Sequence, residues 1–239
     1  MMTAMTATYE DALALARRSV SDVRYPIVKT YTLDPIWVLY DRILRIDPAR
    51  PDDPARDRFL LSKGHGPSAF YAVLAAKGFF PESWLDSIAD ADSRLGSHPD
   101  RTLVPGAEIS AGSLGHGLPL GVGLALGLRA KGYDSQVYVL VGDAELDEGS
   151  NHEAIAYAGA TGLANLHVIV ADNGSASHGW PGGVASRFAV NGWAASTVDS
   201  TDHEALYASL TEPHPGGPRV TVAASTTTPT TPEPPGAPP

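Results

Sequence analysis

The sequence has 239 residues, a formal net charge of −10 and no cysteine. This length suits one α/β domain with short appendages. The lack of cysteine excludes disulfides, thiolate catalysis and zinc–sulfur sites, and fits a reducing cytoplasm. The acidic balance argues against a nucleic-acid partner, because proteins that bind phosphate backbones carry basic patches.

The two ends of the chain and its longest apolar run predict neither export nor a membrane span. The start, Met1 to Glu10, lacks a positive leader and a long apolar core, so it does not resemble a signal peptide. Leu118–Leu128 is apolar but short and rich in glycine. We therefore expect a soluble, cytoplasmic protein with no membrane partner. Residues 225–239 contain Thr, Pro, Glu and Gly and are predicted to form a disordered tail after a single domain over residues 1–224.

The first third of the chain predicts helices. Apolar spacing favours a helix over Tyr9–Val20 and a second over Ile36–Leu44. A third is expected over Ser68–Lys77 and ends at Gly78, which accepts the positive φ of a helix end. A short helix from Pro81 to Ile88 follows.

The central and C-terminal parts alternate between helices and buried strands. Leu114–Lys131 has a helical pattern that contains Gly117, Gly121, Gly123 and Gly127. Each glycine in a helix interior costs about 1 kcal/mol, so we expect close packing against another backbone. Continuous apolar runs predict strands buried on both faces. The predicted strands are 137–141, 166–171, 195–198 and 219–223. One helix is expected over 151–161, and another is expected to begin at a capping box formed by Thr201 and Glu204. The alternation predicts a three-layer α/β/α fold with a mostly parallel sheet.

Polar side chains follow two of the predicted strands, at the point where each strand ends. Gly142-Asp143-Ala144 comes after the first and Asp172-Asn173-Gly174 after the next, with a helix between them. In a right-handed crossover both strand ends emerge at one edge of the sheet, where open parallel sheets bind ligands. One carboxylate oxygen and one amide oxygen suit Mg²⁺, which fills its octahedron with phosphate and water. The alternative is that both segments are ordinary turns after strands.

These segments resemble the thiamine diphosphate fingerprint, a GDG followed about thirty residues later by an asparagine. Over about residues 55–224 the surroundings resemble the transketolase family in five ordered motifs. They are Leu61-Ser62-Lys63-Gly64-His65-Gly66, Gly96-Ser97-His98-Pro99, Gly112-Ser113-Leu114-Gly115-His116-Gly117, Gly142 to Gly149, and Asp172-Asn173.

The resemblance implies roles for individual residues. Asp143, Asn173 and the carbonyl of Ser175 would hold Mg²⁺. The diphosphate would contact His65 and the backbone of Ala144, while the thiamine rings would lie against Gly112, Ser113 and Leu114. His98 would face the substrate, so His65 and His98 are the catalytic candidates, and Glu148 would lie in the contact with a second subunit. His65 could instead cap the following helix, His98 could be an ordinary loop residue, and His116 could either start a helix or contact substrate.

The sequence departs from the family pattern in three places. The early Ser-Gly-His-Pro-Gly segment is replaced by 24–30 without histidine, the third glycine of the fingerprint is Ala144, and the Lys-Gly-Lys-Gly loop after the last strand is absent. The resemblance also implies a glutamate from a second, pyrimidine-binding domain, and we expect no room for such a domain after Ala224. We therefore expect the N-terminal subunit of a split transketolase-like transferase, which uses thiamine diphosphate and Mg²⁺ and moves a two-carbon ketol unit between sugars with a pyrimidine-domain partner. The alternatives are a thiamine-dependent synthase or lyase acting on another carbonyl donor, and a degenerate, regulatory subunit.

Overall fold

The computed structural model describes residues 7–19, 30–214 and 216–225. Its centre is a parallel five-stranded sheet in the order β1-β2-β3-β5-β4. The strands are β1 (Arg58–Leu61), β2 (Val137–Gly142), β3 (Leu166–Asp172), β4 (Ala194–Asp199) and β5 (Arg219–Ala224). The predicted parallel α/β fold is confirmed. The predicted tail lies almost entirely outside the described residues; Ser225, which is described, donates its backbone N–H to the carbonyl of Asp172 at 2.8 Å.

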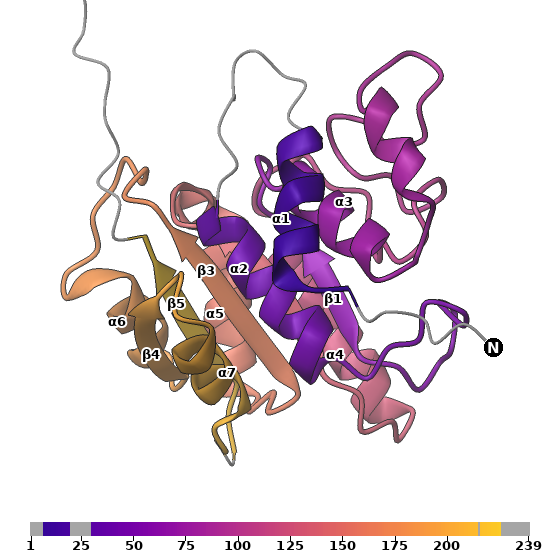
Figure 1. The fold of residues 1–239 in the computed structure, drawn as a ribbon. Coiled ribbons are helices and arrows are strands. Elements are labelled where there is room, and N and C mark those ends of the chain that lie inside the picture. Colours follow the sequence, from indigo (N-terminus) through magenta and orange to yellow (C-terminus); the bar gives the residue numbers. More distant parts are fainter. Residues whose placement is uncertain (1–6, 20–29, 215, 226–239) are drawn as a thin grey trace, which may run out of the picture.

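Helices cover both faces of the sheet (Figure 1). One face carries α1 (Tyr9–Arg18), α2 (Thr30–Val38), α3 (Pro67–Ala76) and α7 (His203–Thr211). The other carries α4 (Gly117–Ala130), α5 (Gly149–Ala160) and α6 (Gly183–Ala189). Shorter helical segments are η1 (Leu39–Ile43), η2 (Glu82–Ser87) and η3 (Ala144–Asp147). Among the described residues, no helix combines the length and apolar character that a membrane crossing needs.

Strands β1, β2, β3 and β5 bury both of their faces, whereas the edge strand β4 is partly exposed. In β2, Tyr138 and Leu140 point into the core under α1, α2, α3 and α7. Val137, Val139 and Val141 alternate with them and pack under α4, α5 and α6. Successive side chains of a strand point to opposite faces, so a strand between two helical layers must be apolar throughout.

Two local predictions differ from the structure. The helix expected at Ile36 already includes Thr30, with Pro35 inside it. The capping box of Thr201 and Glu204 does not form. Instead Asp202 caps α7 by accepting from the backbone N–H groups of Glu204 and Ala205, while Thr201 bonds the carboxylate of Asp199.

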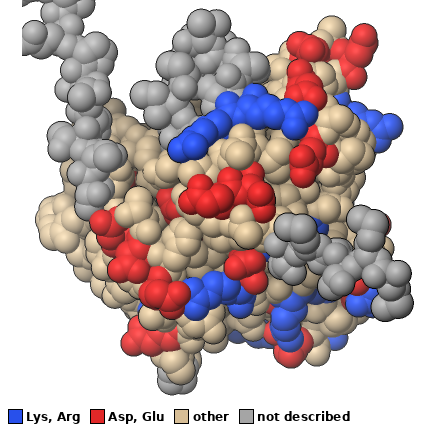
Figure 2. All heavy atoms as spheres, viewed as in Figure 1, with Lys and Arg blue, Asp and Glu red and all other residues tan. Residues whose placement is uncertain are grey.

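Basic side chains on the face with α1, α2, α3 and α7 are interspersed with acidic ones (Figure 2). Arg18 pairs with Asp86 at 2.5 Å, Arg42 with Glu204 at 2.6 Å and Lys77 with Asp41 at 2.5 Å. These cations are therefore engaged with carboxylates of the same chain.

The glycines of α4 divide into two kinds. A Cβ on Gly117 would clash with Ser62, and one on Gly121 would lie 2.5 Å from Cγ2 of Val139. These two allow α4 to approach the sheet closely, as predicted. Gly123 and Gly127 would meet nothing within 4 Å, so for them the prediction of close packing is wrong within the described chain.

This division predicts opposite effects of the same substitution. Gly121→Ala should lower the free energy of unfolding by about 1–3 kcal/mol, because the added methyl overpacks the α4–β2 contact. Gly127→Ala should raise it by up to about 1 kcal/mol through helix propensity. Urea unfolding of the two variants tests this; effects of the same sign would show that the α4–β2 contact is not as tight as described.

Candidate functional site

Asp143 and Asn173 lie at the carboxyl edge of the sheet, directly after β2 and β3. The pairing sets Gly142 beside Ala171, so the residues that follow leave the sheet side by side. Asp143 is buried, and its carboxylate accepts from the backbone N–H of Ser175 at 2.5 Å, the Ser175 hydroxyl at 2.9 Å and the backbone N–H of Ala176 at 2.9 Å. The structure thus brings together the three residues proposed as metal ligands.

The side-chain amide of Asn173 has a defined orientation. Its Nδ2 donates to the hydroxyl of Tyr31 at 3.0 Å. The amide oxygen, Oδ1, therefore points away from Tyr31. That Oδ1 is buried and has no hydrogen-bond partner. An unpaired buried acceptor costs about 1–3 kcal/mol, which a bound cation would recover. Tyr31, which the sequence alone did not identify, therefore aims the amide oxygen.

Lys63 supplies the positive charge at this edge. Its side chain is buried, with Nζ 5.5 Å from the centre of the Tyr31 ring. A Cβ on Gly142 would lie 3.1 Å from that Nζ, so the glycine lets the ammonium group approach the end of β2. An acidic protein needs such a local cation to attract a diphosphate, and the resemblance assigned no role to this lysine.

Glu145 connects three of the sequence motifs. Its buried carboxylate accepts from the Ser62 hydroxyl, from the Gly115 N–H at 3.0 Å and from the Gly142 N–H at 3.1 Å. The Ser62 hydroxyl in turn accepts from the Gly117 N–H at 3.0 Å. The pKa of Glu145 is raised above its ordinary value because the side chain is buried. The three hydrogen bonds and the charge of Lys63 act in the opposite direction. This residue positions the loops around the site.

We expect Glu145→Ala to reduce the free energy of unfolding by roughly 2–4 kcal/mol, because it leaves buried N–H groups unpaired. Glu145→Gln, which keeps an acceptor, should cost clearly less. Glu148→Ala is the matched control on an exposed neighbour and should change stability little. Chemical unfolding of the three variants measures this; equal losses for Glu145→Ala and Glu148→Ala would contradict the role of the network.

The remaining predicted contacts surround the same edge. A Cβ on Gly112, whose φ is +134°, would lie 3.1 Å from the ring of His98, so these two residues touch. A Cβ on Gly64 would lie 3.3 Å from Leu114. His65, His98, Ser113 and Leu114 are exposed. The N-cap of α3 is Gly66, which has no side chain to cap the helix, rather than His65. His116 is the N-cap of α4, also without a side-chain hydrogen bond.

Ala144 occupies the position of the third fingerprint glycine without strain. It begins η3 (Ala144–Asp147). Among the described residues that are not glycine, Ala89 is the one with a positive φ, so the backbone at Ala144 does not require a glycine.

The segment from Gly174 to Gly183 is exposed and held at several points. The backbone N–H of His178 donates to Asp147 at 3.3 Å. Arg187 of α6 is buried and lies 3.6 Å from the same carboxylate, with its guanidinium 5.1 Å from the centre of the Trp180 ring. This segment carries Ser175, so its anchors help to set the position of the Ser175 carbonyl.

The surface beside the site is apolar in part. Leu114 and Leu120 are 41% and 51% exposed. Glu148 is also exposed and packs against Gly115, where an added Cβ would lie 2.6 Å from the Cβ of Glu148. Ile155 of α5 is not part of this surface, because its side chain is 1% exposed and lies in the core under α4 and α5.

The donor set fits a metal ion that completes its coordination shell with oxygen atoms of a bound phosphate group. Among the described residues, no three or more His, Asp or Glu side chains form a metal-binding group. One carboxylate, one amide oxygen and one backbone carbonyl make an incomplete cage. Mg²⁺ tolerates such a set when phosphate oxygens complete the octahedron.

Comparison with known proteins identifies the family. Residues 28–235 match the family described as "Transketolase, thiamine diphosphate binding domain". The chain belongs to the transketolase family. Its structure is similar to the transketolase of Leishmania mexicana, with a TM-score of 0.76 and 27% identity, over 92% of this chain and 37% of that one.

Two curated relatives of the chain have different names and are matched over different shares of their length. The chain is 52% identical over 220 residues to a Rhodococcoides fascians protein named "Ferredoxin fas2", covering 92% of this chain and 72% of that protein. It is 46% identical over 131 residues to an Actinobacillus succinogenes protein whose name makes it one of the subunits of an apulose-4-phosphate transketolase, covering 55% of this chain and 48% of that protein. This transketolase-family chain thus spans about half the length of the second relative.

Proposed function

We propose that this chain binds thiamine diphosphate together with Mg²⁺ and forms the diphosphate-binding half of a two-subunit transketolase. Two observations carry the proposal: the Asp143 carboxylate is buried, and the Oδ1 of Asn173 is buried without a hydrogen-bond partner. In the proposal these two oxygens and the Ser175 carbonyl hold the metal. When bound, thiamine diphosphate supplies the electron sink that lets a carbon–carbon bond beside a carbonyl break.

The chain's own residues would bind and orient the cofactor. Lys63 would balance the negative charge of the diphosphate, and His65 and the backbone of Ala144 would contact it. Gly112, Ser113 and Leu114 would border the thiamine rings. His98, whose ring touches Gly112, would hydrogen-bond a substrate hydroxyl or carbonyl oxygen and so hold the reacting carbonyl in place.

The proposed reaction is transfer of a two-carbon ketol unit from a ketose to an aldose. The name of the Actinobacillus succinogenes relative supports a sugar phosphate as substrate class and a second polypeptide as partner. We propose that the partner carries the pyrimidine-binding domain and covers the surface with Glu148 and Leu114. The name "ferredoxin" is not carried over, since these 239 residues contain no cysteine to bind an iron–sulfur cluster.

The test is reconstitution. The chain is mixed with a candidate partner that carries the pyrimidine-binding domain, and ketol transfer is assayed with ketose phosphates, free ketoses and simple 2-oxo acids. Turnover of a ketose with an aldose acceptor supports the transketolase proposal. Release of product from another carbonyl donor without an aldose would favour the synthase or lyase, and a stable but inactive complex would favour the regulatory role.

A further inference from the structure

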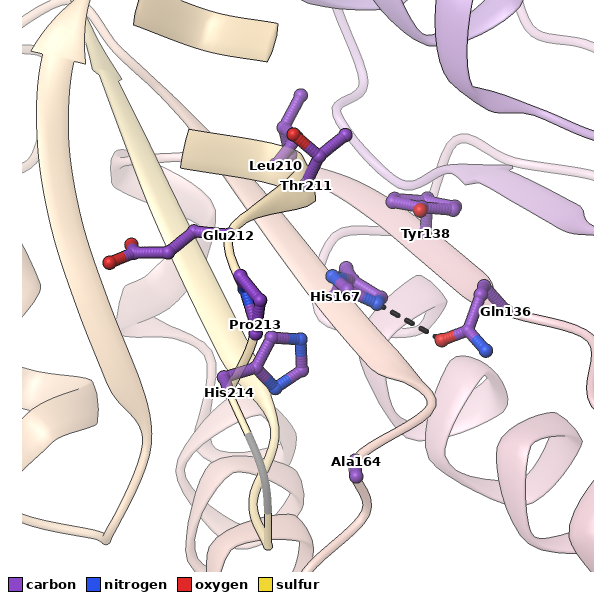
Figure 3. A pocket seen from close by; sticks show the side chains of 9 residues that line it. All are labelled: Gln136, Tyr138, Ala164, His167, Leu210, Thr211, Glu212, Pro213 and His214. Carbon is purple, nitrogen blue, oxygen red and sulfur yellow. Dashed lines mark hydrogen bonds between the residues drawn. The ribbon is translucent and has the colours of Figure 1, made fainter. Parts of the chain in front are cut away.

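Two clusters of polar and aromatic side chains lie at opposite edges of the sheet. One lines a hollow at the amino edge, where His167 bonds Gln136 at 3.1 Å (Figure 3). His167 precedes Asn173 by six positions, about 20 Å of extended strand, so this cluster is remote from the proposed metal ligands. The other cluster surrounds Arg187 of α6, at the carboxyl edge.

Arg187 is buried although it is charged, and its side chain is bonded to the body of the domain. Its Nη2 donates to the backbone carbonyl of Leu146 in η3 and to Nε2 of His152 in α5. A guanidinium carries five N–H donors in a rigid fork, so it can hold several partners at once. Burial and these bonds make Arg187 a fixed point beside the carboxyl edge of the sheet.

The same guanidinium faces two groups that hold the segment of residues 174–183. Its Nη1 lies 3.6 Å from Oδ1 of Asp147, and Oδ2 of Asp147 accepts from the backbone N–H of His178 at 3.3 Å. Its Cζ lies over the ring of Trp180, 5.1 Å from the ring centre. Tryptophan attracts a cation over its face more strongly than the other aromatic side chains do. The segment is therefore linked to Arg187 at two positions, His178 and Trp180.

Ser175 lies between these two links and the end of β3. It precedes His178 by three positions and Trp180 by five, and its backbone N–H and hydroxyl donate to the carboxylate of Asp143. The position of a backbone carbonyl depends on how the chain is held on both of its sides, so the residues that hold the chain decide how well it can bind a metal. Asp143 holds the chain at Ser175 itself, and Arg187 holds it on the side toward α6.

We propose that Arg187 is a positioning residue of the metal site, because it fixes the segment that carries Ser175. The inference rests on the proposed function, in which the Ser175 carbonyl binds Mg²⁺. A role confined to packing α6 would need only the contacts with η3 and α5. The contact with Trp180, which is 36% exposed, reaches the segment instead.

Amide hydrogen exchange in the full chain tests the link between Arg187 and the segment without any cofactor. Arg187→Met removes the charge and the N–H donors but keeps an unbranched side chain, and the amides of Ala176 and His178 should then exchange about tenfold faster than in the wild-type chain. Asn191→Ala is the matched control, since it removes a hydrogen bond of 2.9 Å to the Arg187 carbonyl and leaves the guanidinium in place. It should leave both amides unchanged. Equal exchange in the Arg187→Met and wild-type chains would overturn the proposal.

The second measurement is the affinity for Mn²⁺ in the reconstituted complex with thiamine diphosphate. Residues that hold a metal ligand in place typically contribute about 10–100-fold to metal affinity, so Arg187→Met should weaken binding by about tenfold. Trp180→Ala should weaken it to a similar extent, and Trp180→Phe, which keeps an aromatic face for the guanidinium, should restore most of the loss. The double variant Arg187→Met/Trp180→Ala should bind about as weakly as Arg187→Met alone, because both side chains act through one segment.

The outcomes separate a positioning role from a purely structural one. Near-native amide spectra confirm that each variant folds, and Trp180→Ala, which changes an exposed side chain, supplies the same test where Arg187→Met does not fold. Faster exchange with an unchanged Mn²⁺ affinity would show that Arg187 only stabilises the segment, and would overturn the proposal. A wild-type complex that binds no Mn²⁺ would instead refute the proposed metal site, on which the inference depends.

Discussion

Asp143→Ala is expected to abolish binding of thiamine diphosphate, with a loss of affinity of at least about a hundredfold in the reconstituted complex. Removing a side chain that only hydrogen-bonds to a metal ligand already costs about 10–100-fold, and Asp143 is proposed to contact the ion itself. Calorimetric titration of the cofactor in the presence of Mg²⁺ measures the loss.

The structure suggests controls that separate metal binding from loop structure. Asp143 also accepts three hydrogen bonds from Ser175 and Ala176, so Asp143→Ala loosens that segment as well. Asp143→Asn keeps an acceptor oxygen but loses the charge, and should still bind the cofactor poorly. Asp172→Asn changes a neighbouring carboxylate that bonds the N–H of Gly174, and should stay within about threefold of wild type. Near-native affinity of both Asp143 variants would refute the metal assignment.

The second large effect concerns the partner. The chain on its own is expected to show less than about 1% of the turnover of the reconstituted complex, because acid–base groups typically contribute 10²–10⁴-fold and the required glutamate is proposed to come from the partner. Leu114 and Leu120, which are 41% and 51% exposed beside the site, would be covered in the complex.

The measurement compares the chain, the candidate partner and their mixture at equal concentrations, with and without added cofactor. A mixture containing the Asp143→Ala chain controls for activity that the partner brings with it. Robust turnover by the isolated chain would exclude the split-enzyme proposal.

Strands β2 to β5 could be predicted from the sequence, and so could the position of Asp143 and Asn173 at one edge, because β2 and β3 are apolar runs that end at polar residues. Strand β1 was missed, since Arg58–Leu61 is short and begins with a charged residue that is nevertheless buried. Helix α6 was missed because it has seven residues and begins at Gly183, directly after Gly182; both glycines have positive φ, a pattern typical of a loop.

The residues that hold the site residues in place could not be predicted from the sequence, because their contacts are distant along the chain. Tyr31 orients Asn173 across 142 positions, and Glu145 reaches Ser62 across 83. Nothing local marks such pairs, since they depend on how α2 and the loops pack over the carboxyl edge. The α4 glycines make the same point. One helical pattern contains Gly121, where an added Cβ would clash with Val139, and Gly127, where an added Cβ would meet nothing within 4 Å.

Electron paramagnetic resonance of Mn²⁺ in the reconstituted complex tests the proposed metal–diphosphate site most directly. With thiamine diphosphate present, we expect one bound ion per chain, coupled to the ³¹P nuclei of the cofactor. Asn173→Ala should weaken that binding strongly, whereas Tyr31→Phe, which removes the hydroxyl that accepts from the Asn173 amide, should weaken it less. Cofactor that binds equally well after chelation of all divalent ions, or Mn²⁺ that binds equally to the Asn173→Ala and wild-type chains, would contradict the account.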